Sequence, residues 1–164
     1  MAVVLALLAG VPLVALCVAD LRHRIIPDWC VMALALVGLL QAVGVQQPGD
    51  PAALPSVLAA GGLCALAGAA LSAVGLWGWG DAKLLGAAGL ITGCAGLPRL
   101  MLGMALAGGA LALLLLLLRH LVQRGRLALP RSAPRWLRTE RRRLALAPSV
   151  PYGLAIVAGL LAGM

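Results

Sequence analysis

Long apolar runs separated by short polar stretches make up most of this chain. A helix that spans a bilayer needs about 20 mostly apolar residues, and six runs approach or reach that length. They lie at Met1–Ala19, Trp29–Val45, Leu54–Trp77, Leu84–Leu97, Leu100–Leu118 and Pro148–Met164. The pattern therefore predicts an all-α, polytopic membrane protein with six transmembrane helices, forming a single domain over residues 1–164.

Two boundaries of this pattern need local arguments. The fourth run is the shortest, and it reaches spanning length only if its helix begins near Asp81. Pro98 and Arg99 separate the fourth and fifth runs, and because Pro disfavours helix at the residue before it, we expect a tight turn there. A signal peptide begins with a basic segment, and the first run has no such segment before it. We therefore expect the first run to be a retained helix.

The composition agrees with a membrane protein. Hydrophobic residues make up 63% of the chain and charged residues 11%, and the mean hydropathy is +1.05. These values lie outside the range of soluble domains, so a soluble domain is excluded.

The Lys and Arg residues predict the orientation. With six spans, all of the 13 basic residues except Arg99 fall on one side, and loops rich in Lys and Arg stay in the cytoplasm. Both termini are therefore expected on the opposite side, away from the cytoplasm. The Arg-rich cytoplasmic loop, at about 119–147, is expected to bind anionic headgroups rather than nucleic acid because it lies beside a span; docking of a protein partner is the alternative.

The chain has five acidic residues, and three of them have a structural interpretation. Asp50 lies in a Pro- and Gly-containing outer loop, and Glu140 lies among arginines, so both are expected at the surface. Asp28 follows Pro27, whose ring fixes its own backbone, and is well placed to cap the second helix. Asp20 and Asp81 remain as candidates for chemistry.

Asp20 and Asp81 fall on the same side of the predicted membrane, at the end of the first helix and the start of the fourth. Because a carboxylate in the hydrocarbon core costs about 2.5–3.5 kcal/mol, two at matching depth indicate a shared task. A carboxylate pair can divide a hydrolytic reaction between a base and an acid. The helix dipoles would make Asp81 the base and Asp20 the acid.

The residues around Asp81 are also candidates for a role in the site. Gly78 and Gly80 allow a positive φ or a close approach of another chain, although small residues also pack membrane helices. Lys83 could hold a substrate, act electrostatically on Asp81, or mark the cytoplasmic boundary.

Other catalytic chemistries lack a suitable arrangement of residues. The histidines have no acid or Cys at ligand spacing, the cysteines form no CxxC pair, and the serines lack a nucleophile setting. These residues are His23, His120, Cys17, Cys30, Cys64, Cys94, Ser56, Ser72, Ser132 and Ser149. We therefore expect no metal and no cofactor.

Three segments resemble one known family. "GWGDAK" at 78–83 resembles the GxGD motif of aspartyl intramembrane-type peptidases. "DLRHRIIPDW" at 20–29 and "VPYGLAI" at 150–156 are similar to segments of bacterial type IV prepilin peptidases, which are related to archaeal preflagellin peptidases. The resemblance covers most of the chain and implies a GxGD-type helical bundle.

The resemblance implies roles for individual residues. Asp20 and Asp81 would be the catalytic pair, and Gly78, Gly80, Lys83, Pro27 and Asp28 would belong to the motifs around them. Pro151, Tyr152 and Gly153 would form a packing or substrate-contact element.

The resemblance also implies a substrate. The chain lacks the CxxC-containing region of the long bifunctional enzymes, so methyl transfer is not expected, and the short form resembles the peptidases of Tad/Flp pilus systems. The expected activity is removal of a prepilin leader at the cytoplasmic membrane face, with the pilus-assembly machinery as a possible partner. The alternative functions are a small ion- or proton-coupled transporter component, because paired acids also mark ion pathways, and a pilus-assembly scaffold.

Overall fold

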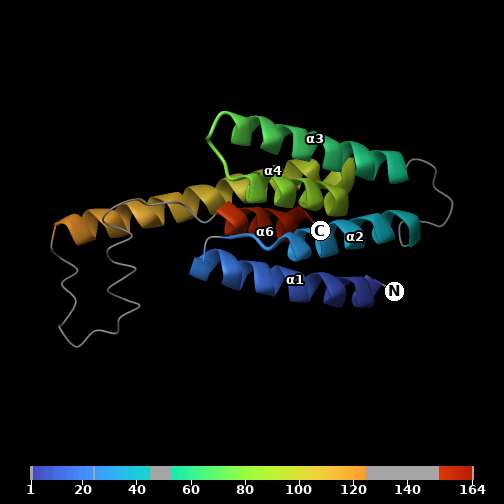
Figure 1. Ribbon diagram of the computed structural model, residues 1–164, viewed down its shortest axis with the longest axis horizontal. Coiled ribbons are helices and arrows are strands. Elements are labelled where there is room, and N and C mark those ends of the chain that lie inside the picture. The colour runs from blue at the N-terminus through green and yellow to red at the C-terminus, as the bar shows by residue number, and fades with distance from the viewer. Residues whose placement is uncertain (1, 24, 45–52, 125–151, 164) are drawn as a thin grey trace. The chain divides into compact units, whose positions relative to one another are not determined.

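The computed structural model describes residues 2–23, 25–44, 53–124 and 152–163, and these residues form helices joined by short connections. The helices are α1 (Ala2–His23), α2 (Asp28–Gly44), α3 (Ala53–Ala73), α4 (Trp79–Gln123) and α6 (Tyr152–Gly163) (Figure 1). The all-α prediction is thus confirmed for the described residues. The Arg-rich loop beyond Arg124, together with Asp50, Glu140 and Pro151, lies outside them.

The chain divides into two compact units. The first contains Met1–Ala107 and Pro151–Met164, and the second contains Gly108–Val150. All the described helices except the later part of α4 belong to the first unit, and so do all the candidate site residues. A single domain over 1–164 stays a prediction.

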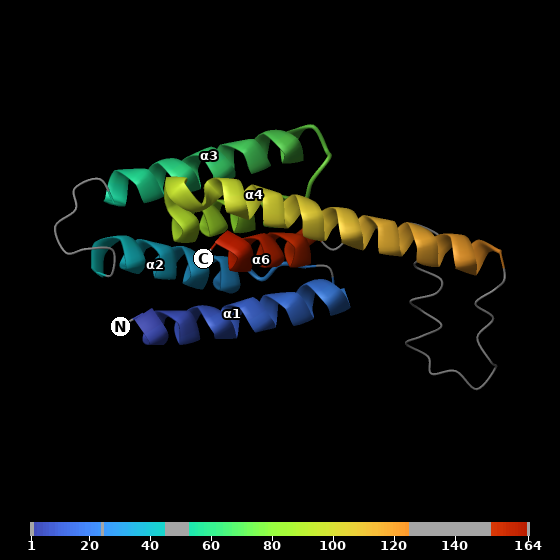
Figure 2. The ribbon, with the colours of Figure 1, turned by 180° about the vertical axis from the view of Figure 1, so that it is seen from behind.

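The core of the first unit draws on all five described helices, α3 through Cys64. Helix α1 packs against α2 and α6, and α2 packs against α3, as Figures 1 and 2 show from opposite sides. The largest fully buried side chains are Leu16, Leu34, Leu84, Leu100, Ile156 and Leu160. Because these leucines and isoleucines come from α1, α2, α4 and α6, burying them holds the two ends of the first unit's sequence together.

Helix α4 contains a sharp reversal at Gly93. Its φ of 60° and ψ of −179° belong to a region of backbone space that is open essentially to Gly alone. After Gly93 the chain runs back along α6, because Gly163 contacts Gly96 while Gly159 contacts Leu100 and Met104. Figures 1 and 2 show this fold-back.

The reversal corrects the sequence expectation. A tight turn between the fourth and fifth runs exists, but the predicted position at Pro98 and Arg99 is wrong. Pro98 lies inside the helix, near the beginning of the returning segment, where a missing N–H is best tolerated. The backbone conformation of Gly93, rather than the proline ring, therefore sets the break.

The end of α3 is also earlier than predicted. Leu76 N–H donates to Leu71 O at 3.0 Å, and Gly75 N–H donates to Ser72 O at 3.0 Å, with Gly75 at a φ of 76°. This is the Schellman arrangement, in which a Gly in the left-handed conformation ends a helix. The third run therefore does not remain helical to Trp77, which lies in the connection to α4.

Two helices of the described residues are long and apolar enough to cross a membrane: Leu54–Ala73 and Trp79–Gln123. Asp28–Val43 and Tyr152–Gly163 are shorter apolar helices. Six transmembrane helices, and their orientation, stay predictions.

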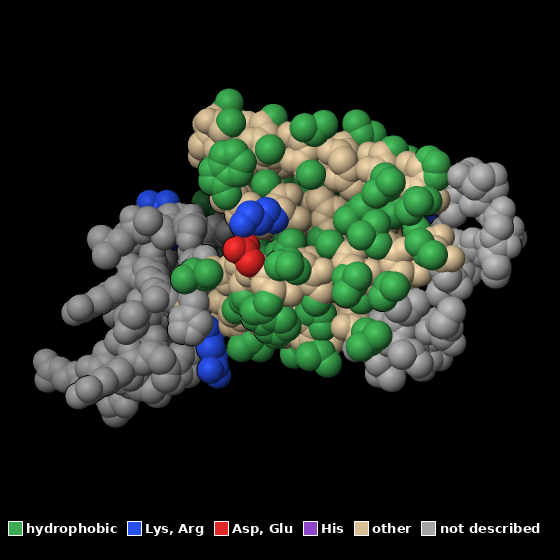
Figure 3. All heavy atoms as spheres, turned by 45° about the vertical axis from the view of Figure 1, so that its right-hand side comes forward, with side chains coloured by type: hydrophobic (Ala, Val, Ile, Leu, Met, Phe, Trp, Pro, Cys, Tyr) green, Lys and Arg blue, Asp and Glu red, His purple; other side chains and the backbone are tan. Residues whose placement is uncertain are grey.

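The surface of the first unit is strongly apolar. Val11, Met32 and Leu66 are 70%, 71% and 71% exposed, and Figure 3 shows hydrophobic side chains spread over the face in view. Exposed apolar surface of this extent suits an apolar environment rather than water.

Candidate active site

Asp20 lies in the last turn of α1 with a side chain that is only 5% exposed. The helix continues past it to His23, so the expectation that Asp20 ends the first helix is wrong by one turn. Its Oδ2 accepts a hydrogen bond of 3.2 Å from the backbone N–H of Leu154. The carboxylate is thus held between the end of α1 and the start of α6.

Gly153 explains how α6 comes so close to this carboxylate. A Cβ at Gly153 would lie 2.7 Å from Oδ2 and 3.1 Å from Cγ of Asp20. Because real Cβ atoms do not approach other atoms so closely, any side chain here would displace Asp20 or α6. The start of α6 therefore brings backbone against Asp20 through Gly153, a contact that the sequence did not reveal.

Asp81 lies in the first turn of α4, which begins at Trp79. The start near Asp81 was predicted and is confirmed. The first bond of the helix runs from Ala82 N–H to Gly78 O at 3.2 Å, and the Asp81 carboxylate accepts a hydrogen bond from the backbone of Gly78. The Asp81 side chain thus makes one of the two hydrogen bonds of a capping box at the start of α4.

The two acids lie near each other, as their predicted common task requires. Asp81 is half-buried, and Asp20 lies within range of an electrostatic interaction with it. The connection between α1 and α2 lies against the same motif, because a Cβ at Gly80 would be 3.2 Å from the Cβ of Ile26. The end of α1 and the starts of α4 and α6 therefore meet at one place.

Lys83 pairs with Asp28 rather than with either central acid. Lys83 Nζ donates to Asp28 Oδ1 at 2.9 Å, and both side chains are exposed. Asp28 is the first residue of α2, at the end where the capping role was predicted, but the bond to Lys83 was not predicted. The helix start is also marked by Cys30 N–H, which donates to Pro27 O at 3.1 Å.

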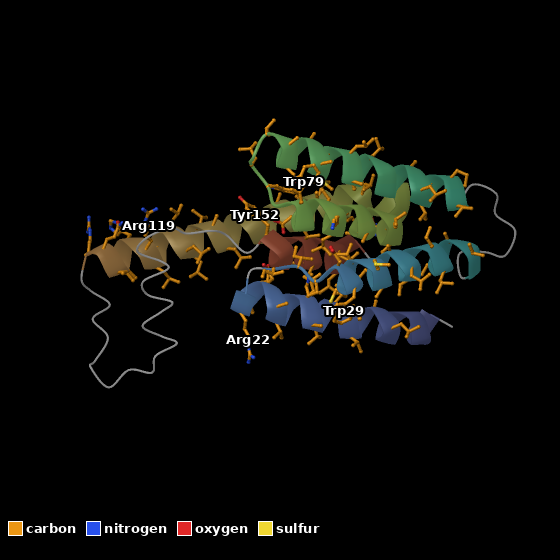
Figure 4. All side chains as sticks on the ribbon, in the orientation of Figure 1. Arg22, Trp29, Trp79, Arg119 and Tyr152 are labelled. Atoms are coloured by element: carbon orange, nitrogen blue, oxygen red, sulfur yellow. The ribbon has the colours of Figure 1, made fainter. Side chains whose placement is uncertain are left out.

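An aromatic contact joins the connection before α4 to α6. The rings of Trp77 and Tyr152 are 5.7 Å apart between centroids and tilted by 37°. Figure 4 shows Tyr152 at the start of α6, whereas Arg22 points away from the end of α1. Trp77 is a residue that the sequence reasoning missed, and its only signal there is its place directly before the "GWGDAK" motif.

Ser72 is a second residue that the sequence reasoning set aside. Its side chain is buried, and its Oγ lies 2.9 Å from Gly68 O and 3.2 Å from Gly78 O. From the sequence we expected no role for Ser72, because it lacks a nucleophile setting. Its contact with Gly78 connects α3 to the backbone that Asp81 caps.

The described residues include no group of three His, Cys, Asp or Glu side chains that could hold a metal ion. The four cysteines are free thiols and lie one each on α1, α2, α3 and α4.

Comparison with known proteins identifies the family. Residues 6–113 match the family model of the type IV leader peptidase family, a segment that includes Asp20 and Asp81. No curated protein and no solved structure matches the chain. Together with the two long apolar helices, the family match indicates a membrane protein. The chain belongs to the type IV leader peptidase family, whose members are peptidases that act on prepilin-type substrates.

Proposed function

We propose that this protein is an aspartyl endopeptidase of the bacterial inner membrane that removes the leader of a Flp/Tad-like prepilin, with Asp20 and Asp81 as its catalytic pair. The observation that carries the proposal is the meeting of the two acids. Asp20 is buried at the end of α1 against the start of α6, and it lies within range of an electrostatic interaction with Asp81 at the start of α4. Two carboxylates so placed can share a proton and divide acid and base work.

The proposed reaction is the hydrolysis of one peptide bond. The ionised carboxylate takes a proton from water as the oxygen adds to the scissile carbonyl carbon, while the protonated carboxyl donates to the carbonyl oxygen. The C–N bond then breaks, and the leaving amine takes up a proton. The products are the free leader and the mature pilin with a new N-terminus.

The acid and base roles depend on α6 as well as on the helices that carry the pair. The dipoles of α1 and α4 alone favour Asp81 as the base, as the sequence predicts. Leu154 N–H, at the N-terminus of α6, donates a hydrogen bond to Asp20 Oδ2. The start of α6 therefore favours the ionised form of Asp20, just as the start of α4 favours the ionised form of Asp81. The dipoles of α1 and α4 therefore do not divide the roles by themselves.

The surrounding residues would hold the pair in place. Gly78 and Gly80 shape the backbone at the start of α4, Gly153 lets α6 reach Asp20, and the pair of Lys83 and Asp28 ties α4 to α2.

The charge pattern supports cleavage at the cytoplasmic face. Asp20 and Asp81 lie on the side of the predicted spans that carries nearly all the Lys and Arg residues, which is the side that stays in the cytoplasm. A prepilin would place its apolar helix in the bilayer and its polar leader at this face. The Arg-rich segment at about 119–147 would bind anionic headgroups or dock the assembly machinery.

The test is co-expression with a Flp-type precursor, whose size on a gel reports cleavage. We expect the native chain to yield the mature band and both Asp20→Asn and Asp81→Asn to lose it at unchanged membrane levels. Asp50→Asn, the same change at an acid assigned to an outer loop, is the matched control and should cleave normally. Processing at the native rate by either central variant would remove that residue from the catalytic pair and favour a transporter or scaffold.

Three further measurements test the finer parts of the proposal. Cleavage of a Flp-type precursor in preference to a longer type IV pilin precursor would support the substrate class. An alkaline phosphatase fused to the C-terminus should be active, because the C-terminus is predicted in the periplasm, and an inactive fusion would contradict the orientation. A search for N-methylation of the mature pilin should find none.

A further inference from the structure

The Ser72 hydroxyl contacts a second carbonyl in addition to the one within its own helix. Ser72 lies in the last turns of α3, where a serine hydroxyl commonly bonds to the carbonyl four residues earlier, here Gly68 O at 2.9 Å. The second acceptor, Gly78 O at 3.2 Å, lies beyond the end of the helix. Because a hydroxyl has one proton, Ser72 shares it between its own helix and the "GWGDAK" motif.

Gly78 is in turn the residue that holds Asp81. Its carbonyl accepts the first hydrogen bond of α4, from Ala82 N–H, and its backbone donates to the Asp81 carboxylate. An atom at the Cβ position of Gly78 would lie 3.2 Å from Asp81 Oδ2, so the two residues are in direct contact. Any movement of Gly78 would therefore move the Asp81 carboxylate.

Between Ser72 and Gly78 the chain is also held by the turn at Gly75 and by the ring contact of Trp77 with Tyr152, and neither of these contacts involves Gly78 itself. The described backbone bonds within the connection are those of the turn at Gly75, which end at Leu76, and Gly78 itself has no side chain to anchor it. Ser72 is 7% exposed, so water does not readily replace its hydroxyl. Loss of the hydroxyl would leave the Gly78 carbonyl with the Ala82 bond alone.

We infer that Ser72 is a positioning residue for the reaction: its hydroxyl fixes Gly78, and Gly78 fixes Asp81 relative to Asp20. This inference rests on the proposed function, because it assumes that Asp81 takes part in catalysis. Ser72 itself touches neither substrate nor the reacting atoms. Its loss should therefore slow the chemical step and leave precursor binding unchanged.

The experiment measures kcat and KM for precursor cleavage by the purified full chain in lipid nanodiscs. A misplacement of about 1 Å at a catalytic group can cost about 100-fold in rate, and for Ser72→Ala we expect kcat to fall by about 10- to 100-fold with KM within about twofold. Ser72→Thr keeps the hydroxyl and should recover most of the loss. Ser56→Ala is the matched control, because Ser56 lies on the same helix and bonds instead to Cys94 near the bend, and it should cleave normally.

Three results would overturn the inference: a native kcat in Ser72→Ala, a loss that appears only in KM, or a Ser72→Thr variant as slow as Ser72→Ala. The rate of a variant is counted only if the variant elutes as a single folded species on size exclusion. If Ser72→Ala does not fold, Ser72→Cys replaces it, because a thiol is close in size to a hydroxyl but is a weaker hydrogen-bond donor. Asp81→Asn is measured in parallel. If Asp81→Asn is inactive and Ser72→Ala is normal, only the role of Ser72 fails; if Asp81→Asn cleaves, the proposed function fails as well.

Discussion

Lys83 Nζ donates a hydrogen bond to Asp28 Oδ1 at 2.9 Å, and this bond joins the first turn of α2 to the first turns of α4. Lys83 lies two residues after Asp81, so the bond ties the helix that carries one central acid to a neighbouring helix. Because both side chains are exposed, the pair contributes only about 0.2–1 kcal/mol to the free energy of unfolding. Its importance would lie in the placement of α4 rather than in stability.

Reversal of the charges tests this role. We expect Lys83→Asp and Asp28→Lys each to reduce the cleavage rate by about tenfold, because like charges would separate the two helix starts. The double variant restores opposite charges and should recover most of the activity, while the melting temperature changes little throughout. A double variant as slow as the single ones would show that Lys83 acts on the substrate or on Asp81 instead.

Gly153→Ala should inactivate the protein without unfolding it. The new Cβ would lie 2.7 Å from Asp20 Oδ2, so the carboxylate must move, and displacement of this size can cost about 100-fold in rate. The measurement is the rate of precursor processing. Gly10→Ala, on the same helix as Asp20 and with nothing within 4 Å of the added atom, should process normally. Native activity in Gly153→Ala would contradict the contact between α6 and Asp20.

Gly93→Ala should destabilise the fold through backbone strain. An Ala would have room, since the nearest atoms are 3.6 Å and 3.8 Å from its Cβ, but it would be forced into a conformation that costs about 1–3 kcal/mol. Thermal unfolding in detergent should show a lower melting temperature.

Gly62→Ala is the matched control for this prediction. Gly62 lies within α3 with open space around it, and Ala in a helix is favoured over Gly by about 0.5–1 kcal/mol. Its melting temperature should stay level or rise. A Gly93→Ala variant as stable as Gly62→Ala would argue against the reversal at this residue.

The ring contact between Trp77 and Tyr152 should be measurable as a coupling. Aromatic pairs contribute about 0.5–1.5 kcal/mol beyond area burial, so Tyr152→Ala should lower stability while Tyr152→Phe, which keeps the ring, should not. In a double-mutant cycle with Trp77→Ala, the losses should be less than additive. Equal damage from Phe and Ala would instead point to the hydroxyl of Tyr152.

The sequence singles out two candidate acids, but it does not predict every helix boundary around them. Asp20 and Asp81 stand out because an acid is rare and costly in such an apolar chain, and this signal is local. The ends of α3 and of the first part of α4 depend on Gly75 and Gly93 in positive-φ conformations. With 21 glycines in the chain, composition does not indicate which of them adopt that conformation.

The partners of the site residues could not be predicted for a related reason. Lys83 lies near Asp81 in sequence but bonds to Asp28, and Asp20 bonds to Leu154 from the opposite end of the chain. A backbone N–H has no signature in the sequence, because every residue except Pro carries one.

The sequence by itself thus determined the helical class, the membrane character and the two candidate acids, since hydropathy and rare charges are properties of short segments. The tertiary structure decided what surrounds those acids. The start of α6 bonds to Asp20, and Gly78, which Ser72 contacts, holds Asp81. The tertiary structure also decided that the chain reverses at Gly93. These contacts join residues far apart along the chain, and they form only when buried leucines such as Leu16 and Leu160 draw the helices together.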